Sequence, residues 1–299
     1  MEFGKLENIQ GIDWKLPASD LYNSLKVSLS APRIFVGAPA WGAKQWLGKI
    51  YPEHTPADQF LYHYSRNFNC IELNSTHYGI PATEKAQDWL DKVPSTFKFC
   101  PKFPQDISHS RFGITDKFLI SAWINFLTTI QECLGTTFIQ FHEKFSYEEK
   151  YFLFQFLENW PKEFRLSIEF RHPSWFHEHT ILPALGDYLR RKEVGLVVTD
   201  VAGRRDVLHS SFTAPWSMIR LIGNELDPSD GLRLKLWAER LADWKESGVA
   251  ETFLFLHQPE DKLTIEFAEL AQDIFSAAGH TEVPKMQKIV SRDFFSMGL

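Results

Sequence analysis

The stretch TFIQFHEKFSYEEKYFLFQFLENWPKEFRLSIEFR, residues 137–171, decides the fold. It begins with one short apolar run, at 137–142, and ends with another, at 166–171. Residues 147–159 between them have the apolar spacing of a helix. A strand, a helix and a second strand in succession predict a parallel βαβ unit.

The same unit recurs along the chain. Short apolar runs with centres about 31 residues apart, the size of one strand and helix, occupy residues 34–37, 70–74, 97–102, 137–142, 166–171, 195–200, 218–222 and 252–257. Helical patterns fill most of the gaps, at 114–130, 147–159, 180–193, 234–244 and 265–275. Alternating strands and helices predict an α/β fold with parallel pairing, and eight units favour a TIM-type (β/α)8 barrel.

One unit departs from this pattern. Residues 201–216 have no helical stripe, so we expect the sixth unit to be irregular. An open sheet of seven or eight strands is the alternative architecture. The remaining residues predict an N-terminal extension at 1–32, one barrel domain at 33–280 and a C-terminal tail at 281–299.

Composition narrows the class of protein. The 299 residues carry 32 Lys and Arg against 38 Asp and Glu, so a general nucleic-acid binder, which needs a basic surplus, is not indicated. The three cysteines form no CxxC pair, which argues against a disulfide framework or a zinc ribbon and favours the cytoplasm. No signal peptide and no run of about 18 apolar residues is seen, so no membrane partner is expected.

Polar side chains gather where the predicted strands end. A barrel brings the carboxyl ends of its strands to one mouth, where the active site lies. Side chains two residues apart share a face of a strand. The groups expected at the mouth are Glu72, Asn74, Lys102, Gln140, His142, Glu169, Arg171, Asp200, Arg220 and His257.

Several motifs resemble the YecE-like family, over about residues 34–275. They include GAPAW at 37–41, WLGKIYP at 46–52, FNCIELNSTHY at 68–78 and EFRH at 169–172. The family is described as a domain of unknown function with a TIM-barrel-like fold. The resemblance therefore implies the fold and the place of a site, and no reaction.

The sequence also departs from the family pattern. Ile222 stands where the family usually has a His on the seventh strand. His257-Gln258 replaces the usual Asn pair on the eighth strand, and Pro39 replaces a usual Ser. If these positions contact ligand, this protein binds a different molecule or lacks activity.

The carboxylates Glu72, Glu169 and Asp200 are the candidate catalytic groups, because two carboxylates with separated pKa values can act as general acid and base. The structural alternative is that each pairs with a cation, Glu169 with Arg171 and Glu72 with Lys102, since buried charges must be paired. We expect Asp200 to orient the reacting groups or share a proton.

The predicted ligand is small and anionic or sugar-like. Lys102, Arg171 and Arg220 suit a phosphate or carboxylate, which accepts charge-assisted hydrogen bonds. Asn74 and Gln140 can fix hydroxyl or carbonyl groups. The candidates for further ligand contact are Trp41, Tyr78, His142 and His257, the first two by stacking on a ring.

Two other functions stay open. Glu72, His142, Glu169, Asp200 and His257 have the atoms for a divalent metal, as in a metal-dependent isomerase or phosphoesterase. No local metal-ligand motif and no nucleotide-binding glycine motif occurs, so no metal site or cofactor is predicted. The third hypothesis is a barrel that binds a ligand or partner and catalyses nothing. Sequence gives no oligomeric state.

Overall fold

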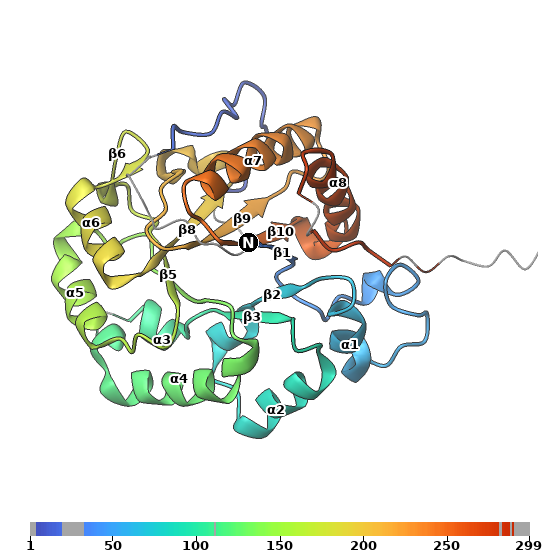
Figure 1. Ribbon diagram of the computed structural model, residues 1–299, viewed down its shortest axis with the longest axis horizontal. Helices are drawn as coiled ribbons and strands as arrows, with labels where there is room; N and C mark the ends of the chain where they lie inside the picture. The colour runs from blue at the N-terminus through green and yellow to red at the C-terminus, as the bar shows by residue number, and fades with distance from the viewer. Residues whose placement is uncertain (1–3, 20–32, 111, 281–282, 288, 290–299) are drawn as a thin grey trace, which may run out of the picture.

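The structure is a computed structural model that describes residues 4–19, 33–110, 112–280, 283–287 and 289. Each of the eight predicted strands is present, and in Figure 1 they occupy the middle of the molecule. They are β1 (Arg33–Gly37), β2 (Cys70–Leu73), β3 (Lys98–Pro101), β4 (Thr137–Gln140), β5 (Leu166–Glu169), β8 (Gly195–Asp200), β9 (Trp216–Ile222) and β10 (Glu251–His257).

Helices surround the strands (Figure 1). They are α1 (Phe60–Tyr64), α2 (Thr83–Lys92), α3 (Gln105–Ser108), α4 (Lys117–Thr129), α5 (Lys150–Asn159), α6 (Pro183–Lys192), α7 (Pro228–Glu246) and α8 (Thr264–Ala277). The five helices predicted from apolar spacing correspond to α4 to α8 and are confirmed. Capping carboxylates fix two starts: Asp116 accepts hydrogen bonds from the first turn of α4, and Asp227 does so for α7.

The sixth unit is irregular, as predicted. Between β8 and β9 the chain forms a short 3-10 helix, Ala202–Val207, and no α-helix over this fully described stretch. The sequence did not predict the small antiparallel hairpin of β6 (Phe176–His177) and β7 (Thr180–Ile181). Two-residue strands are too short to produce a recognisable alternation.

The α/β class is confirmed, with a mostly parallel central sheet. Six strands pair in the order β1-β10-β9-β8-β5-β4, and β2 and β3 form a separate parallel pair. Two backbone bonds link the pair to each neighbour. On the β1 side, Asn69 N donates to Val36 O at 3.3 Å and Glu72 N to Ala38 O at 3.1 Å. On the β4 side, Gly135 N donates to Phe99 O and Phe103 N to Phe138 O, both at 2.9 Å. Among the described residues, no continuous ladder joins all eight strands, so the predicted closed barrel is not confirmed.

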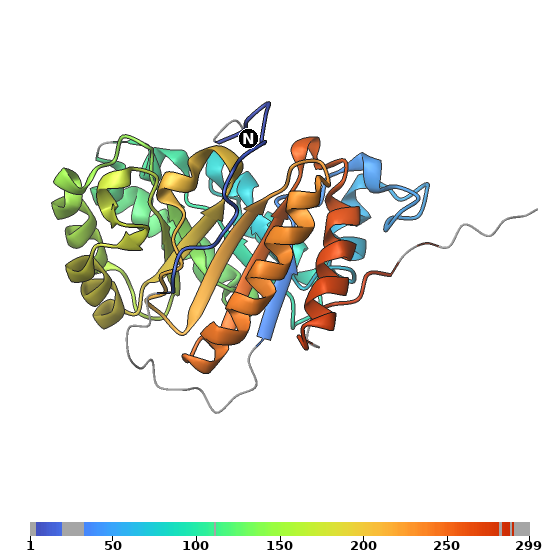
Figure 2. The ribbon, with the colours of Figure 1, turned by 90° about the horizontal axis from the view of Figure 1, so that it is seen from above.

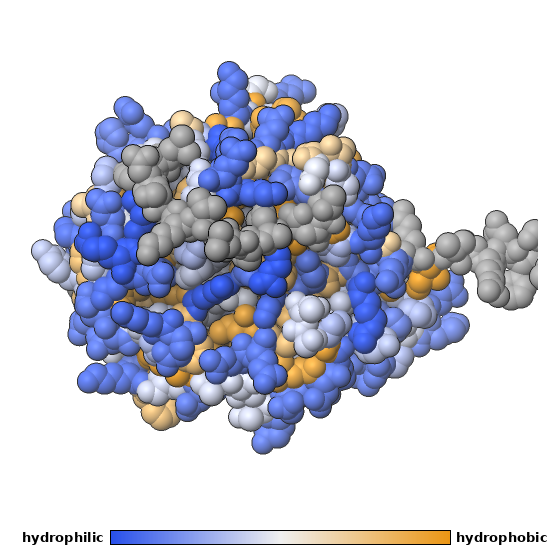
Figure 3. Space-filling model, in the orientation of Figure 1, coloured by the Kyte–Doolittle hydropathy of each residue, from blue (hydrophilic) through white to orange (hydrophobic). Residues whose placement is uncertain are grey.

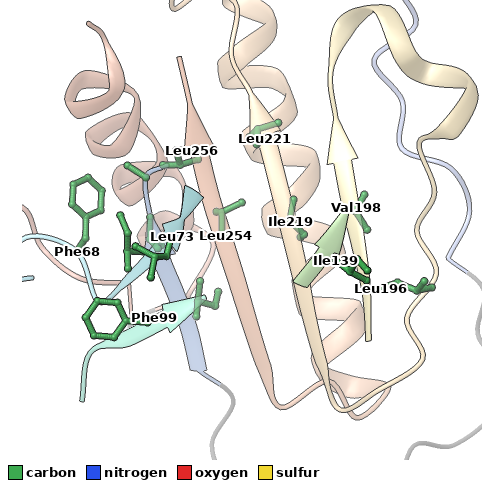
Figure 4. Packing of buried hydrophobic residues seen from close by; sticks show 14 of the residues in the cluster. Phe68, Leu73, Phe99, Ile139, Leu196, Val198, Ile219, Leu221, Leu254 and Leu256 are labelled. Atoms are coloured by element: carbon green, nitrogen blue, oxygen red, sulfur yellow. The ribbon is translucent and has the colours of Figure 1, made fainter. Parts of the chain in front are cut away.

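The two faces of the strands pack into two separate apolar clusters. Residues such as Val198, Ile219 and Leu254 point toward the helices and belong to the larger one (Figure 4). The alternate positions meet in a smaller cluster on the inner side, made of Phe35, Cys70, Cys100, Phe138, Val197, Ala214, Trp216, Met218, Phe253 and Phe255. Gly37 lets β1 approach β2, because a Cβ there would collide with the carbonyl of Cys70.

The N-terminal extension lies against α7 and the 3-10 helix Ala202–Val207. Its described residues 4–19 start above the strand ends and run down the side of the molecule (Figure 2). Arg240 donates to Pro17 O at 2.7 Å, and the Trp244 indole donates to Ser19 Oγ at 2.9 Å. Residues 1–3 and 20–32 of the predicted extension are outside the described residues.

The predicted C-terminal tail is described only at residues 283–287 and 289. Gln287 N donates to Asn67 Oδ1 at 2.7 Å, so this part returns to the α1 region.

Most side chains on the face shown in Figure 3 are hydrophilic. Within the described residues, no helix has both the length and the apolar character needed to cross a membrane.

Candidate functional site

The candidate site lies directly beyond the inner apolar cluster. Moving two residues along each strand keeps the side chain on the same face. This step leads from Cys70 to Glu72, from Cys100 to Lys102, from Phe138 to Gln140, from Met218 to Arg220 and from Phe255 to His257. The strands therefore change from apolar to charged at their carboxyl ends, and the charged groups are buried together.

Arg220 is the centre of this group and is fully buried. Its Nε and Nη2 donate to the two oxygens of Glu72 at 3.0 and 2.9 Å. Its Nη1 donates to Glu169 Oε2 at 3.0 Å. One guanidinium on β9 thus bridges carboxylates on β2 and β5, and its planar fork suits this two-sided pairing.

Each carboxylate has further partners. His257 Nε2 lies 2.9 Å from Glu72 Oε2, and Asn74 donates to Glu72 Oε1 at 2.8 Å. Arg171 Nε donates to Glu169 Oε1 at 2.7 Å. The Glu169–Arg171 pair is therefore present as expected, whereas Glu72 pairs with Arg220 and His257 instead of Lys102.

Gln140 connects this network to Lys102. Its Nε2 donates to Glu169 Oε2 at 2.7 Å, and its Oε1 accepts from Lys102 Nζ at 2.8 Å. The amide thus stands between the lysine and the carboxylate. Lys102 is 7% exposed, and its backbone is held by a Lys102 N to Leu73 O hydrogen bond of 3.2 Å.

The network sets the ionisation of its members. Burial would raise the pKa of Glu72 and Glu169, but nearby cations outweigh it. Arg220 and His257 hold the pKa of Glu72 well below its usual range, and Arg171 and Arg220 lower that of Glu169 to about 2. Burial, followed by Arg220, lowers the pKa of Lys102 to about 8.

A cavity of about 860 Å³ opens above the network. Six of the predicted site residues line it: Asn74, Tyr78, Lys102, Gln140, Arg171 and His257. Glu72, Glu169 and Arg220 lie beneath its floor. Glu72 accepts from Asn74 and Glu169 accepts from Gln140, both of which line the cavity, and Arg220 donates to the two carboxylates. The positions that depart from the family pattern, Pro39, Ile222 and Gln258, are in the cavity wall.

The structure places Asp200 elsewhere. Its Oδ1 accepts from Arg205 at 2.5 Å and from Arg233 at 3.3 Å, and its Oδ2 accepts from the Trp237 indole at 2.8 Å. On β8 it shares a face with Val198, which points outward to the helices. Its predicted position at the mouth is therefore wrong.

Two further candidates lie away from the cavity lining. Trp41 packs edge-on against Trp89, with ring centroids 5.5 Å apart, so it supports the loop after β1. His142 is exposed and contacts His109, which in turn contacts His77. Of these three histidines, His77 lines the cavity. The described residues contain no group of three His, Cys, Asp or Glu side chains placed to hold a metal ion.

Sequence reasoning missed one wall of the cavity. Gly4, Lys5, Leu6, Glu7 and Ile9 of the N-terminal extension line it. The segment is attached by a Gly203 N to Gly4 O hydrogen bond of 2.9 Å. Farther along, the Trp14 ring lies 4.8 Å from the Arg233 guanidinium and 5.5 Å from that of Arg205. The extension has no sustained apolar period, so nothing in the sequence indicated where it would dock.

The chain is similar in sequence to bacterial proteins. It is 28% identical over 245 residues to the UPF0759 protein YecE of Escherichia coli K12, covering 76% of this chain and 87% of YecE. It is 30% identical over 80 residues to the UPF0759 protein YunF of Bacillus subtilis, covering 27% of each chain.

Solved structures agree with this relationship. A DUF72 family protein from Enterococcus faecalis superposes with a TM-score of 0.66 at 18% identity, covering 81% of this chain and 95% of that one. A DUF72 family protein from Thermotoga maritima gives a TM-score of 0.64 at 24% identity, covering 83% of this chain and 99% of that one. The family described as "Protein of unknown function DUF72" matches residues 35–288, so the chain belongs to the DUF72 family, and the resemblance seen in its motifs is confirmed.

Proposed function

We propose that the cavity binds a small organic anion that carries a phosphate or carboxylate group. The observation that carries the proposal is the convergence of two cationic side chains on one cavity. Lys102 reaches it from the end of β3, and Arg171 reaches it from just beyond β5. Cations in a partly enclosed site bind oxyanions through charge-assisted hydrogen bonds.

The rest of the cavity lining is mainly acidic. Glu7, Glu225, Glu260 and Asp261 line it against one further cation, Lys5. A polyanion would meet these carboxylates and be repelled. The ligand that fits best therefore has one terminal anionic group and a neutral or cationic remainder, such as a hydroxylated or amino-bearing acid.

The proposed chemistry is metal-independent acid–base catalysis, with His257 as the group that exchanges a proton. Glu72 and Glu169 have lowered pKa values and are ionised at neutral pH, so they are poor general acids. We assign them positioning roles instead. Glu72 orients the His257 ring through Nε2, which makes Nδ1 the nitrogen for proton exchange.

A second candidate is a barrel that binds the anion without turnover. The pairing of both carboxylates with Arg220 favours it, because neither carboxylate reaches the cavity itself.

We also propose that the eight strands form a TIM-type barrel over residues 33–280. The inner cluster supports this, since it collects side chains from β1 to β4 and from β8 to β10.

The binding experiment uses isothermal titration of the full chain with sulfate and with a panel of phosphorylated and carboxylic metabolites. We expect K102M and R171M each to weaken sulfate binding by about tenfold. The matched control is K98M, because Lys98 lies on the same strand but donates to Glu132 O near the surface. Equal affinity in all four proteins would reject the proposed site.

Catalysis is tested once a bound metabolite is known. H257Q should abolish turnover while leaving binding of that metabolite within about threefold. Binding with no turnover in the wild-type protein would select the non-catalytic candidate.

The three buried free cysteines are consistent with the proposed cytoplasmic location.

A further inference from the structure

We propose that Lys102 is a nucleophilic amine that forms a covalent imine with carbonyl-bearing organic anions. The proposal rests on the anion site described above and narrows its ligand to an aldehyde or ketone, such as an oxo acid or an aldehyde phosphate. It gives Lys102 a role beyond charge attraction.

The position of Lys102 is fixed by the fold. It directly follows β3, and its backbone is tied on both sides: Lys102 N donates to Leu73 O at 3.2 Å, and Thr76 Oγ1 donates to Lys102 O at 2.7 Å. The side chain is buried yet lines the cavity. A reacting group held by a rigid element can meet its substrate in one geometry.

The surroundings of Lys102 favour the neutral amine. The charged groups that face it are Arg220 from β9, Arg171 from the segment after β5, Glu72 from β2 and Glu169 from β5. The imidazoles of His77 and His109 also feel its charge. Burial and Arg220 lower the pKa of Lys102 to about 8, despite the two carboxylates.

Gln140 explains why the carboxylates do not hold the proton on Lys102. Among the described residues, the hydrogen-bond partner of Nζ is the neutral Oε1 of Gln140. The amide group of the same side chain is directed to Glu169. A neutral acceptor loses less than a carboxylate would when NH3⁺ becomes NH2, and the amine can still donate an N–H to it, so the amine stays oriented after it loses its proton.

The reaction balances with water as the only other product. The Nζ lone pair attacks the carbonyl carbon, and one proton of the amine passes to the carbonyl oxygen to give a carbinolamine. The carbinolamine loses water, and the C=N bond of the imine forms. Arg171, on the same cavity, would hold the anionic group of the ligand.

The lowered pKa of Lys102 predicts how strongly an aldehyde prefers this lysine over exposed lysines. At pH 8 about half of the Lys102 amines are neutral, against about one in 250 for a lysine of ordinary pKa. An aldehyde should therefore modify Lys102 about a hundredfold faster than an exposed lysine.

The experiment uses pyridoxal 5′-phosphate, which carries an aldehyde and a phosphate, with sodium borohydride to reduce the imine. The full chain is labelled at pH values from 6 to 10 and the modified peptides are identified by mass spectrometry. We expect one equivalent on Lys102, with a rate that is half-maximal near pH 8, the pKa of Lys102. Excess sulfate should compete.

Three variants separate the outcomes. K102R keeps the charge and should lose the label, whereas K98M should label normally. R171M should slow labelling by the phosphate-bearing aldehyde but not by propanal, which has no anionic group. Label spread over surface lysines, or label unchanged in K102R, overturns the proposal. If sulfate still binds in that case, the proposed anion site stands without the imine; if sulfate does not bind either, both fail.

Discussion

Arg220 and Glu72 form a two-point ion pair with no solvent contact, in which Nη2 and Nε lie 2.9 and 3.0 Å from the two carboxylate oxygens. The same guanidinium also donates to Glu169. The pair lies beneath the floor of the cavity, and together with Glu169 its first function is to hold β2, β5 and β9 in one arrangement beneath the ligand.

Replacing Arg220 should therefore destabilise the protein strongly. R220M leaves two buried carboxylates without their shared cation, and the free energy of unfolding should fall by about 3–5 kcal/mol. Urea unfolding followed by tryptophan fluorescence measures this. The triple variant R220M/E72Q/E169Q should be more stable than R220M, because it removes the unpaired charges together. A triple variant less stable than R220M would contradict this account.

The free energy of unfolding should also fall at acid pH, because Glu169 becomes protonated there. Its pKa is about 2 in the folded protein against an ordinary 4.5, so the stabilisation is complete above about pH 4.5 and is lost as pH falls toward 2. Its full size is about 3 kcal/mol. The difference in unfolding free energy between wild type and E169Q should shrink from pH 7 to pH 3. A constant difference would show that Glu169 keeps its ordinary pKa.

Anion binding should weaken at alkaline pH. Lys102 attracts an anion only when protonated, and its pKa is about 8. The affinity for sulfate should therefore fall by about tenfold between pH 7 and pH 9. Titration calorimetry at both values tests this. K102M should bind weakly at both, and a wild-type affinity that does not change would exclude Lys102 from the site.

The N-terminal wall can be displaced by one methyl group. A Cβ on residue 203 would lie 2.8 Å from Gly4 O, so G203A should push the extension away from the cavity. We expect a loss of about 1–3 kcal/mol and faster proteolysis of residues 4–19. G42A is the matched control, since nothing lies within 4 Å of a Cβ at that position. Unchanged proteolysis in G203A would mean that the contact does not hold the segment.

Asp200 should affect stability without affecting binding. D200N weakens buried pairs with Arg205 and Arg233 and should cost about 3 kcal/mol. Its sulfate affinity should match that of the wild type, because Asp200 does not line the cavity. Loss of affinity under conditions where the variant remains folded would return Asp200 to the site.

These results define what could be predicted from sequence. The strand at 166–171 and the helix at 147–159 were predicted because each has a strong period of its own. The two-residue alternation also placed Glu72, Gln140 and Glu169 together. They lie two residues beyond Cys70 and Phe138 of the inner cluster and beyond Ser167, which accepts from the Trp216 indole of that cluster. These features depend on the spacing of residues along the chain, which can be seen in a single sequence.

The rest depends on contacts between distant segments. A strand end can carry its polar residue on either face, and the register between β8 and β9, which pairs Thr199 with Arg220, directs Asp200 outward. The choice of Arg220 over Lys102 as the partner of Glu72 follows from how β2 faces β9 across the interior. Neither relationship leaves a periodic signal in the chain.

The position of Gly4 in the cavity wall has a practical consequence for anyone who prepares this protein. Any polypeptide joined ahead of Gly4, such as an affinity tag, is attached close to the cavity, because Gly4 lines it. Such a tag can cover the opening or contribute its own histidines to it. Ligand screens should therefore use protein tagged at the other terminus, whose described part docks near Asn67.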